Sequence, residues 1–203
     1  MHAIIIHGMG RTPLSMCFLA TRLRAAGIKI SLFAYTATFE DWGVCTKKLC
    51  AFIDKRVGEE DFIVIAHSLG TVLTRAVLPT TCRKPAACFF LAPPTQACIA
   101  ACRLAPRWWY RLLAGEMGQL LANQEFMSTL PIPEVPTKIY AGNAGLTGRY
   151  SPFKEEPNDG VLMVKETFLP DIPFQVVPSL HTFIMNNRMI AKDIIEITKK
   201  LKT

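Results

Sequence analysis

One serine stands in a setting suited to nucleophilic chemistry. Ser68 lies in the segment Ala66–Gly70 (AHSLG), directly after an apolar, strand-like run and directly before a helical pattern. A sharp strand-to-helix turn exposes a serine in this way, and it needs small residues two positions before and after it. Ala66 and Gly70 meet that need, and a helix N-terminus favours an oxyanion. The pattern predicts that Ser68 is a nucleophile; the plainer alternative is a serine that caps the helix.

A glycine-rich segment, His7–Gly10 (HGMG), follows the first apolar run of the chain. Acyl-transfer chemistry needs two backbone N–H donors for the developing oxyanion, one from the residue after the nucleophile and one from such a loop. We therefore expect an oxyanion hole formed by the N–H groups of Leu69 and Met9. An ordinary glycine turn is the alternative, and His7 is interpreted as a residue that shapes this loop.

A general base is expected among the four histidines. His2 and His7 belong to the first strand, and His67 adjoins the nucleophile, where a sharp turn directs its side chain elsewhere. His181 follows the last predicted strand, at the position where a base can meet Ser68. Elimination and position therefore predict His181 as the base; a lone surface histidine is the alternative.

The acid that orients the base is expected between the serine and the histidine in chain order. Asp159, in the segment Pro157–Val161 (PNDGV), satisfies that order and precedes His181 by a short interval. Asn-Asp-Gly is also a turn signal, so a plain turn aspartate is the alternative. Four other carboxylates compete for this role: Glu155, Glu156, Glu166 and Asp171.

Short apolar runs alternate with amphipathic segments along the whole chain. The predicted strands are Ala3–His7, Lys29–Ala34, Phe62–Ala66, Ala86–Ala92, Thr137–Ala141 and Phe174–Val177. Helices are expected from the cap Thr12 to Ala26, from the cap Asp41 to Val57, over Leu69–Leu78 and over Asn187–Leu201. This alternation predicts an α/β fold with about six mostly parallel strands flanked by helices. Residues 95–130 break the rhythm and predict a helical insertion or lid, and residues 143–173 look loop-rich.

Composition limits the classes to which the chain can belong. With 203 residues, half of them hydrophobic and 19% charged, we expect one globular domain over residues 1–203. The net charge of +7 fits anionic partners or merely a basic protein, and no RNA-binding aromatic motif accompanies it, so nucleic acid is not an expected partner. Seven cysteines without framework spacing, and no signal-like segment at the start, lead us to expect a cytoplasmic location.

The insertion carries basic and aromatic residues side by side. We expect a helix that starts at Pro106, with Arg103, Arg107 and Arg111 four residues apart on one face, next to Trp108 and Trp109. Such a helix suits an anionic membrane surface or a lid whose tryptophans bind an acyl substrate. The alternative is a helix that packs its tryptophans on the sheet while its arginines meet water.

At HGMG, AHSLG, Asn158–Val161 (NDGV) and His181, the chain resembles the α/β-hydrolase superfamily. It is most similar to small bacterial lipases and esterases and to the lipase-like group that includes GPI-inositol deacylases. The resemblance spans nearly the whole chain, and it implies hydrolysis of carboxylic esters through an acyl-enzyme without metal or cofactor. The chain starts directly at the strand that precedes the oxyanion loop, so we expect a minimal member of this fold.

Three other functions stay open: a thioesterase, an amidase and a non-catalytic binding protein. The same triad cleaves thioesters and amides, so a thioesterase or an amidase is the first alternative. A non-catalytic protein of this fold that binds a lipid or a partner is the second, although it has no need of all three triad residues. A small-molecule or lipid ester is the substrate that we expect.

Overall fold

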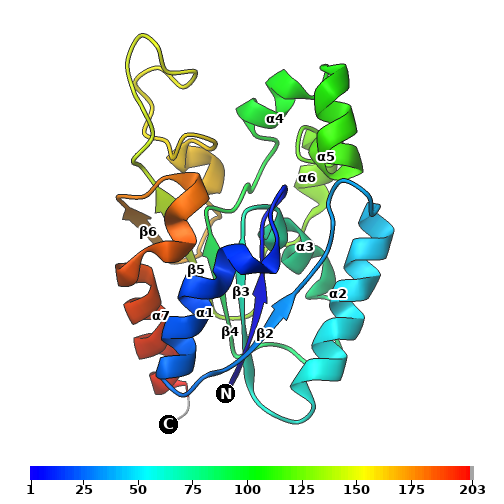
Figure 1. Ribbon diagram of the computed structural model, residues 1–203, viewed down its shortest axis with the longest axis vertical. Coiled ribbons are helices and arrows are strands. Elements are labelled where there is room, and N and C mark those ends of the chain that lie inside the picture. Colours follow the sequence, from blue (N-terminus) through cyan, green and yellow to red (C-terminus); the bar gives the residue numbers. More distant parts are fainter. Residues whose placement is uncertain (202–203) are drawn as a thin grey trace.

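Six runs of apolar and β-branched residues form one parallel sheet in the computed structural model, which describes residues 1–201 (Figure 1). The strands are β1 (His2–Ile6), β2 (Lys29–Phe33), β3 (Phe62–His67), β4 (Ala87–Leu91), β5 (Thr137–Gly142) and β6 (Phe174–Val177). They lie in the order β2-β1-β3-β4-β5-β6, and every neighbouring pair is parallel. The predicted α/β class is confirmed, and all six strands fall where the sequence placed them.

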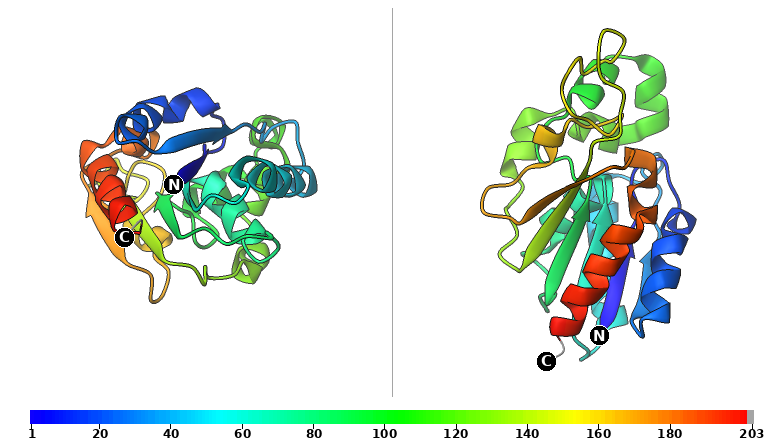
Figure 2. Two further views of the ribbon diagram at one scale, coloured as in Figure 1. Left: turned by 90° about the horizontal axis from the view of Figure 1, so that it is seen from below. Right: turned by 90° about the vertical axis from the view of Figure 1, so that its left-hand side faces the viewer.

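Helices cover both faces of the sheet, so successive strand residues point into two separate cores (Figure 2). Ile4 and Val64 pack in the core beneath α2 (Trp42–Val57) and α3 (Leu69–Val77). Ile5 and Ile65 pack in the opposite core, beneath α1 (Cys17–Ala25) and α7 (Arg188–Lys200). Burial on both faces explains why these strands are continuously apolar rather than alternating.

Side-chain caps set the start of two long helices. Asp41 Oδ1 accepts the N–H of Val44 at 2.7 Å at the start of α2, as the sequence predicts. Asn187 caps α7 in the same way. Thr12 holds the predicted N-cap position before Pro13, but its side chain makes no cap hydrogen bond, and a short 3₁₀ helix, η1 (Pro13–Met16), precedes α1.

The insertion between β4 and β5 is helical, and it stands beyond the carboxyl ends of the strands (Figure 1). It holds α4 (Ile99–Leu104), α5 (Trp108–Leu120) and α6 (Gln124–Thr129). The single helix expected from Pro106 is wrong, because the chain turns between α4 and α5 and leaves Arg103 on the former. Within α5, Gly115 has a φ of +57°, and a Cβ there would lie 2.9 Å from the Thr38 carbonyl oxygen.

The loop-rich region after β5 contains one short 3₁₀ helix, η2 (Val164–Thr167), and a further one, η3 (His181–Asn186), follows β6. The part of this region before η2 rises beside the insertion (Figure 1). Met1 and the end of α7 lie together at the opposite, lower end of the molecule. Within residues 1–201, no helix is both long and apolar enough to cross a bilayer.

Candidate active site

Three side chains from distant parts of the sequence form a continuous hydrogen-bonded chain at the carboxyl ends of the strands. Ser68 Oγ lies 3.0 Å from His181 Nε2, and His181 Nδ1 lies 2.7 Å from Asp159 Oδ2. Because a carboxylate only accepts, the imidazole carries its proton on Nδ1, and Nε2 is left to accept from the serine hydroxyl. This is the nucleophile–base–acid geometry that the sequence predicts for these three residues.

Asp159 is almost completely buried, with 2% of its surface exposed. Its second oxygen, Oδ1, accepts the N–H groups of Val161 at 2.9 Å and Leu162 at 2.7 Å. These bonds fix the carboxylate in the turn after Asn158, whose backbone pairs with Met163. A buried carboxylate with both oxygens bonded is held in one orientation, which suits a group that must fix the tautomer of His181.

The turn at Ser68 has the strained backbone expected of an exposed nucleophile. Ser68 has φ +50° and ψ −122°, a conformation that non-glycine residues rarely adopt. Gly70 makes the turn possible, because a Cβ at this position would lie 2.7 Å from the His7 carbonyl oxygen. Gly8 is limited in the same way by His67 Nδ1, also at 2.7 Å. A glycine is therefore required two positions after Ser68 and on the loop after β1 that packs against this turn.

The two N–H groups expected to form the oxyanion hole lie on the loops that meet at Ser68. Leu69 is the first residue of α3, and Met9 lines the same cavity as Ser68. Within residues 1–201, neither N–H donates to an acceptor. Two unused donors beside the nucleophile are compatible with the predicted role.

His67 contributes to the site although the sequence analysis gave it no role. It is fully buried, and its Nε2 donates to the backbone carbonyl of His181 at 3.1 Å. Burial lowers the pKa of His67 well below its usual value, and the nearby His181 adds to that effect. A neutral His67 therefore holds the backbone of the base, while its ring packs against Gly8 of the oxyanion loop.

A cavity of about 260 Å³ opens at Ser68 and His181. Its other lining residues are Met9, Arg11, His67, Pro94, Cys98, Ala100, Ala101, Leu104, Tyr110, Leu121, Val161, Leu162 and Thr182. Most of these side chains are apolar, and several come from the insertion. The cavity can therefore hold a hydrocarbon chain next to the nucleophile.

Trp108 and Trp109, which the sequence predicts to bind substrate, do not lie at this cavity. Neither lines it, and Trp108 is 76% exposed. The alternative, in which both tryptophans pack on the sheet, is not met either. Tyr110 takes the inward position on the same helix. Helical periodicity was visible in the sequence, but not which face of α5 would turn inward.

Two buried charged residues, Glu166 and Arg75, hold the insertion in place. Nothing in the sequence indicated this role. Glu166, a rival for the acid role, lies away from His181; its carboxylate accepts the N–H groups of Ile99 at 2.7 Å and Met163 at 2.8 Å. Arg75, on the helix of the nucleophile, donates to the carbonyls of Leu130, Pro131 and Thr95. Both ends of the insertion are thus bonded to the elements that carry the triad.

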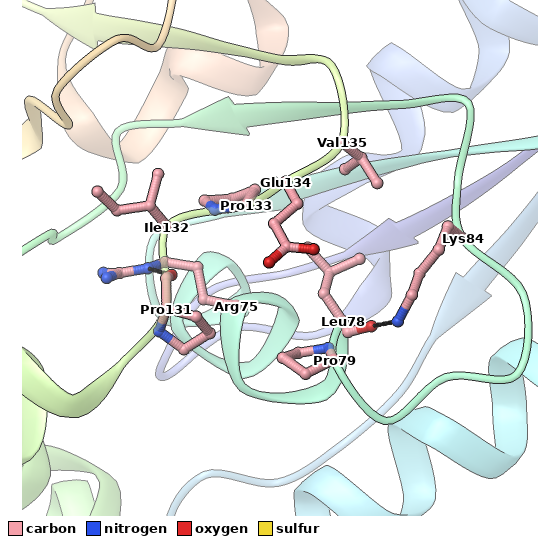
Figure 3. A pocket seen from close by; sticks show the side chains of 9 residues that line it. All are labelled: Arg75, Leu78, Pro79, Lys84, Pro131, Ile132, Pro133, Glu134 and Val135. Carbon is pink, nitrogen blue, oxygen red and sulfur yellow. Dashed lines mark hydrogen bonds between the residues drawn. The ribbon is translucent and has the colours of Figure 1, made fainter.

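A second cavity, of about 230 Å³, is lined by Arg75 and lies near the amino ends of β4 and β5 (Figure 3). Pro131, Ile132 and Glu134 form one side, and Lys84, which donates to the carbonyl of Leu78, closes another. None of the triad residues reaches it, so it is separate from the candidate active site. Across residues 1–201, no group of three or more potential metal ligands is found.

No protein-family model matches the sequence, and neither does any curated protein. Solved structures do match. A Bacillus licheniformis lipase, BlEst2, in mature form has a TM-score of 0.79 at 15% identity, over 96% of this chain and 90% of that chain. A metagenomic carboxyl esterase has a TM-score of 0.72 at 15% identity, over 100% and 75%. A hydrolase of the α/β superfamily from Xanthomonas campestris has a TM-score of 0.65 at 15% identity, over 98% of both chains. The chain therefore has the α/β-hydrolase fold, whereas no comparison supports the GPI-inositol deacylase group in particular.

Proposed function

We propose that this protein is a serine hydrolase that cleaves carboxylic esters of apolar acyl groups through an acyl-enzyme. The observation that carries the proposal is the unbroken hydrogen-bonded chain from Ser68 through His181 to Asp159, with Ser68 in a strained turn. Strain at a residue persists only where the surrounding structure enforces it, and it clusters at functional sites. A protein that only binds a ligand needs neither the strained turn nor the hydrogen-bonded chain.

The proposed reaction uses each group at its observed position. His181 Nε2 accepts the proton of Ser68 Oγ as the oxygen attacks the ester carbonyl, and Asp159 stabilises the resulting imidazolium. The N–H groups of Met9 and Leu69 stabilise the oxyanion of the tetrahedral intermediate. His181 then gives its proton to the leaving alcohol, and a water molecule releases the acyl group by the reverse steps.

An apolar ester is favoured as the substrate because the cavity at Ser68 is lined mostly by side chains such as Leu104, Leu121 and Leu162. The fold of a lipase and of a carboxyl esterase, both similar to this chain, is compatible with that substrate. Thioesters and amides are the alternatives that the same triad could cleave. We also propose a cytoplasmic location, for which the support is the odd number of cysteines, all unpaired.

The test is hydrolysis of p-nitrophenyl esters of increasing acyl length by the wild type, by Ser68→Ala and by the control Ser15→Ala. Ser15 is a half-buried serine of η1 whose hydroxyl donates to the backbone carbonyl of Thr12. We expect Ser68→Ala to lose nearly all turnover with unchanged circular dichroism, and Ser15→Ala to match the wild type. A folded wild type without activity on any ester, or an active Ser68→Ala, would contradict the proposal.

A further inference from the structure

Helix α5 has two apolar faces, of which the chain itself covers only one. Its inward face consists of four buried residues, of which Tyr110 and Ala114 precede the kink at Gly115 and Met117 and Gly118 follow it. Its outward face consists of Trp108, Trp109, Leu112 and Leu113. On this face Trp108 is 76% exposed, Leu112 68% and Leu113 65%. A contiguous outward stripe of large apolar side chains marks an interaction surface rather than an ordinary solvated helix.

A second segment places large side chains at the same end of the molecule. The loop over residues 143–157 exposes Leu146 and Tyr150, and it rises beside the insertion in Figure 1 and in the right-hand view of Figure 2. The loop contacts the insertion through α4, where Arg103 donates to the carbonyl of Pro152 at 3.0 Å. We call the outward face of α5 and this loop together the docking face.

Basic side chains border the exposed apolar residues of α5. Arg107 and Arg111 flank these residues, and within residues 1–201 neither arginine forms an ion pair. The loop over residues 143–157 carries two basic and two acidic side chains. On the loop, the guanidinium of Arg149 lies 5.9 Å from the ring of Tyr150. Tryptophan, leucine and tyrosine side chains bordered by arginine are the combination that enters the interfacial region of an anionic bilayer.

The docking face lies next to the opening of the candidate active site. Leu104 and Tyr110 line the Ser68 cavity from α4 and α5, the two helices that border this face. Arg11 is the one Lys, Arg, Asp or Glu side chain among the described residues that line the cavity. A cation without a carboxylate partner inside the cavity suits an ester that carries an anionic group close to the bond that is cleaved.

We infer that the docking face binds the surface of an anionic phospholipid bilayer and brings the Ser68 cavity to its lipid esters. The identity of the substrate rests on the proposed function, whereas binding to the bilayer does not. A second copy of the chain fits this face less well. Facing copies would bring Arg107 and Arg111 close to their own counterparts, and like charges repel at such an interface.

Binding is measured by co-sedimentation of the wild-type protein with vesicles of phosphatidylcholine alone, or of three parts phosphatidylcholine and one part phosphatidylglycerol. We expect binding only to the second kind, with a shift of the tryptophan emission to shorter wavelength. The variant Arg107→Glu/Arg111→Glu should bind at least about tenfold more weakly, because each basic residue near the bilayer adds to the attraction. The matched control Lys47→Glu/Lys55→Glu changes two exposed charges on α2 and should bind like the wild type.

Several outcomes separate this inference from the proposed function. Vesicle binding without any ester hydrolysis would sustain the docking face and remove the proposed function. Hydrolysis of soluble short esters without vesicle binding would do the reverse. Equal loss of binding in the α2 control, or a dimer in sedimentation velocity that Leu112→Ser/Leu113→Ser dissociates, would overturn the assignment of the docking face. Short-ester turnover by the Arg107→Glu/Arg111→Glu variant confirms that it is folded.

Discussion

The triad and the insertion stand side by side at one end of the sheet, yet different interactions hold them in place. Around Ser68, hydrogen bonds join Ser68, His181 and Asp159, and two glycines pack against backbone and side-chain atoms with no space for a Cβ. Around α5, large apolar side chains face outward, and a few hydrogen bonds at the roots of the insertion fix its position. The first region is built to hold one geometry, and the second presents a surface.

The comparison teaches that rigidity at the site does not come from the insertion. Asp159, His181 and Ser68 are positioned by loops at the carboxyl ends of strands, with His67 as the link between them. Sequence changes in the outward face of α5 should therefore leave the triad intact. Changes at the triad or at its supporting glycines should affect chemistry or stability directly.

The largest effect is expected for Asp159→Asn. An asparagine can keep its oxygen on the N–H groups of Val161 and Leu162, and it then turns an NH₂ group toward His181 Nδ1. That favours the wrong imidazole tautomer, so kcat should fall by about 10⁴-fold with little change in fold. Steady-state kinetics on a short p-nitrophenyl ester measures it. A loss below tenfold would show that Asp159 is only a turn residue.

Gly70→Ala should destabilise the framework by about 1–3 kcal/mol, because the added Cβ meets the His7 carbonyl oxygen and the close-packed turn must shift. The matched control is Gly43→Ala on α2, where the nearest atom to the new Cβ, Asp41 Oδ1, is at 3.5 Å. In a helix, that change should be neutral or stabilise by about 0.5–1 kcal/mol. Urea unfolding of both variants measures the difference, and equal stability would argue against tight packing at Gly70.

A lower pH should reduce the free energy of unfolding through His67. Its pKa is lowered in the folded state, so below about pH 6.5 the unfolded chain binds a proton that the folded chain excludes. The contribution of His67 to the free energy of unfolding is therefore fully present above that pH. As the pH drops, this contribution falls by at most about 1.4 kcal/mol per pH unit. His67→Gln, which cannot titrate, should show a smaller loss between pH 7 and pH 5 in urea unfolding. An identical pH dependence in both proteins would refute a neutral, buried His67.

The smallest effect is expected for Leu112→Ser on the outward face of α5. Because Leu112 packs against little of the chain, the change in the free energy of unfolding should stay within about 0.5 kcal/mol. Met117→Ala, on the inward face of the same helix, should cost about 2–5 kcal/mol. Thermal unfolding of the two variants compares the faces, and a similar loss in both would mean that the outward face is covered.

Sequence reasoning located the strands and the three side chains that form the hydrogen-bonded chain, because both depend on local patterns. The continuous apolar runs of β1, β3 and β4 are typical of strands buried on two faces, and AHSLG, NDGV and a late histidine occur in the order that the chemistry needs. Register and strand order follow from packing, which periodicity alone does not give. The oxyanion N–H groups of Met9 and Leu69 remain a prediction.

The insertion could not be predicted to the same depth. Pro106 suggested a helix start, but the chain turns there, and the helix begins only at Trp108. Since α5 is apolar on two sides, its sequence does not say which side faces inward. Arg75 and Glu166 resemble any other charged residues in the sequence, and each binds a backbone group more than 50 residues away along the chain, Leu130 and Ile99 respectively.

Both described ends of the chain lie at the lower end of the molecule, beneath the amino ends of the strands, whereas the Ser68 cavity opens at the other end (Figure 1). A fusion partner or a surface linker attached at either terminus would therefore extend away from the opening of the Ser68 cavity. The protein can be immobilised through its ends with the docking face turned outward. In that orientation, tethered molecules and supported bilayers can be brought together to follow hydrolysis at an interface directly.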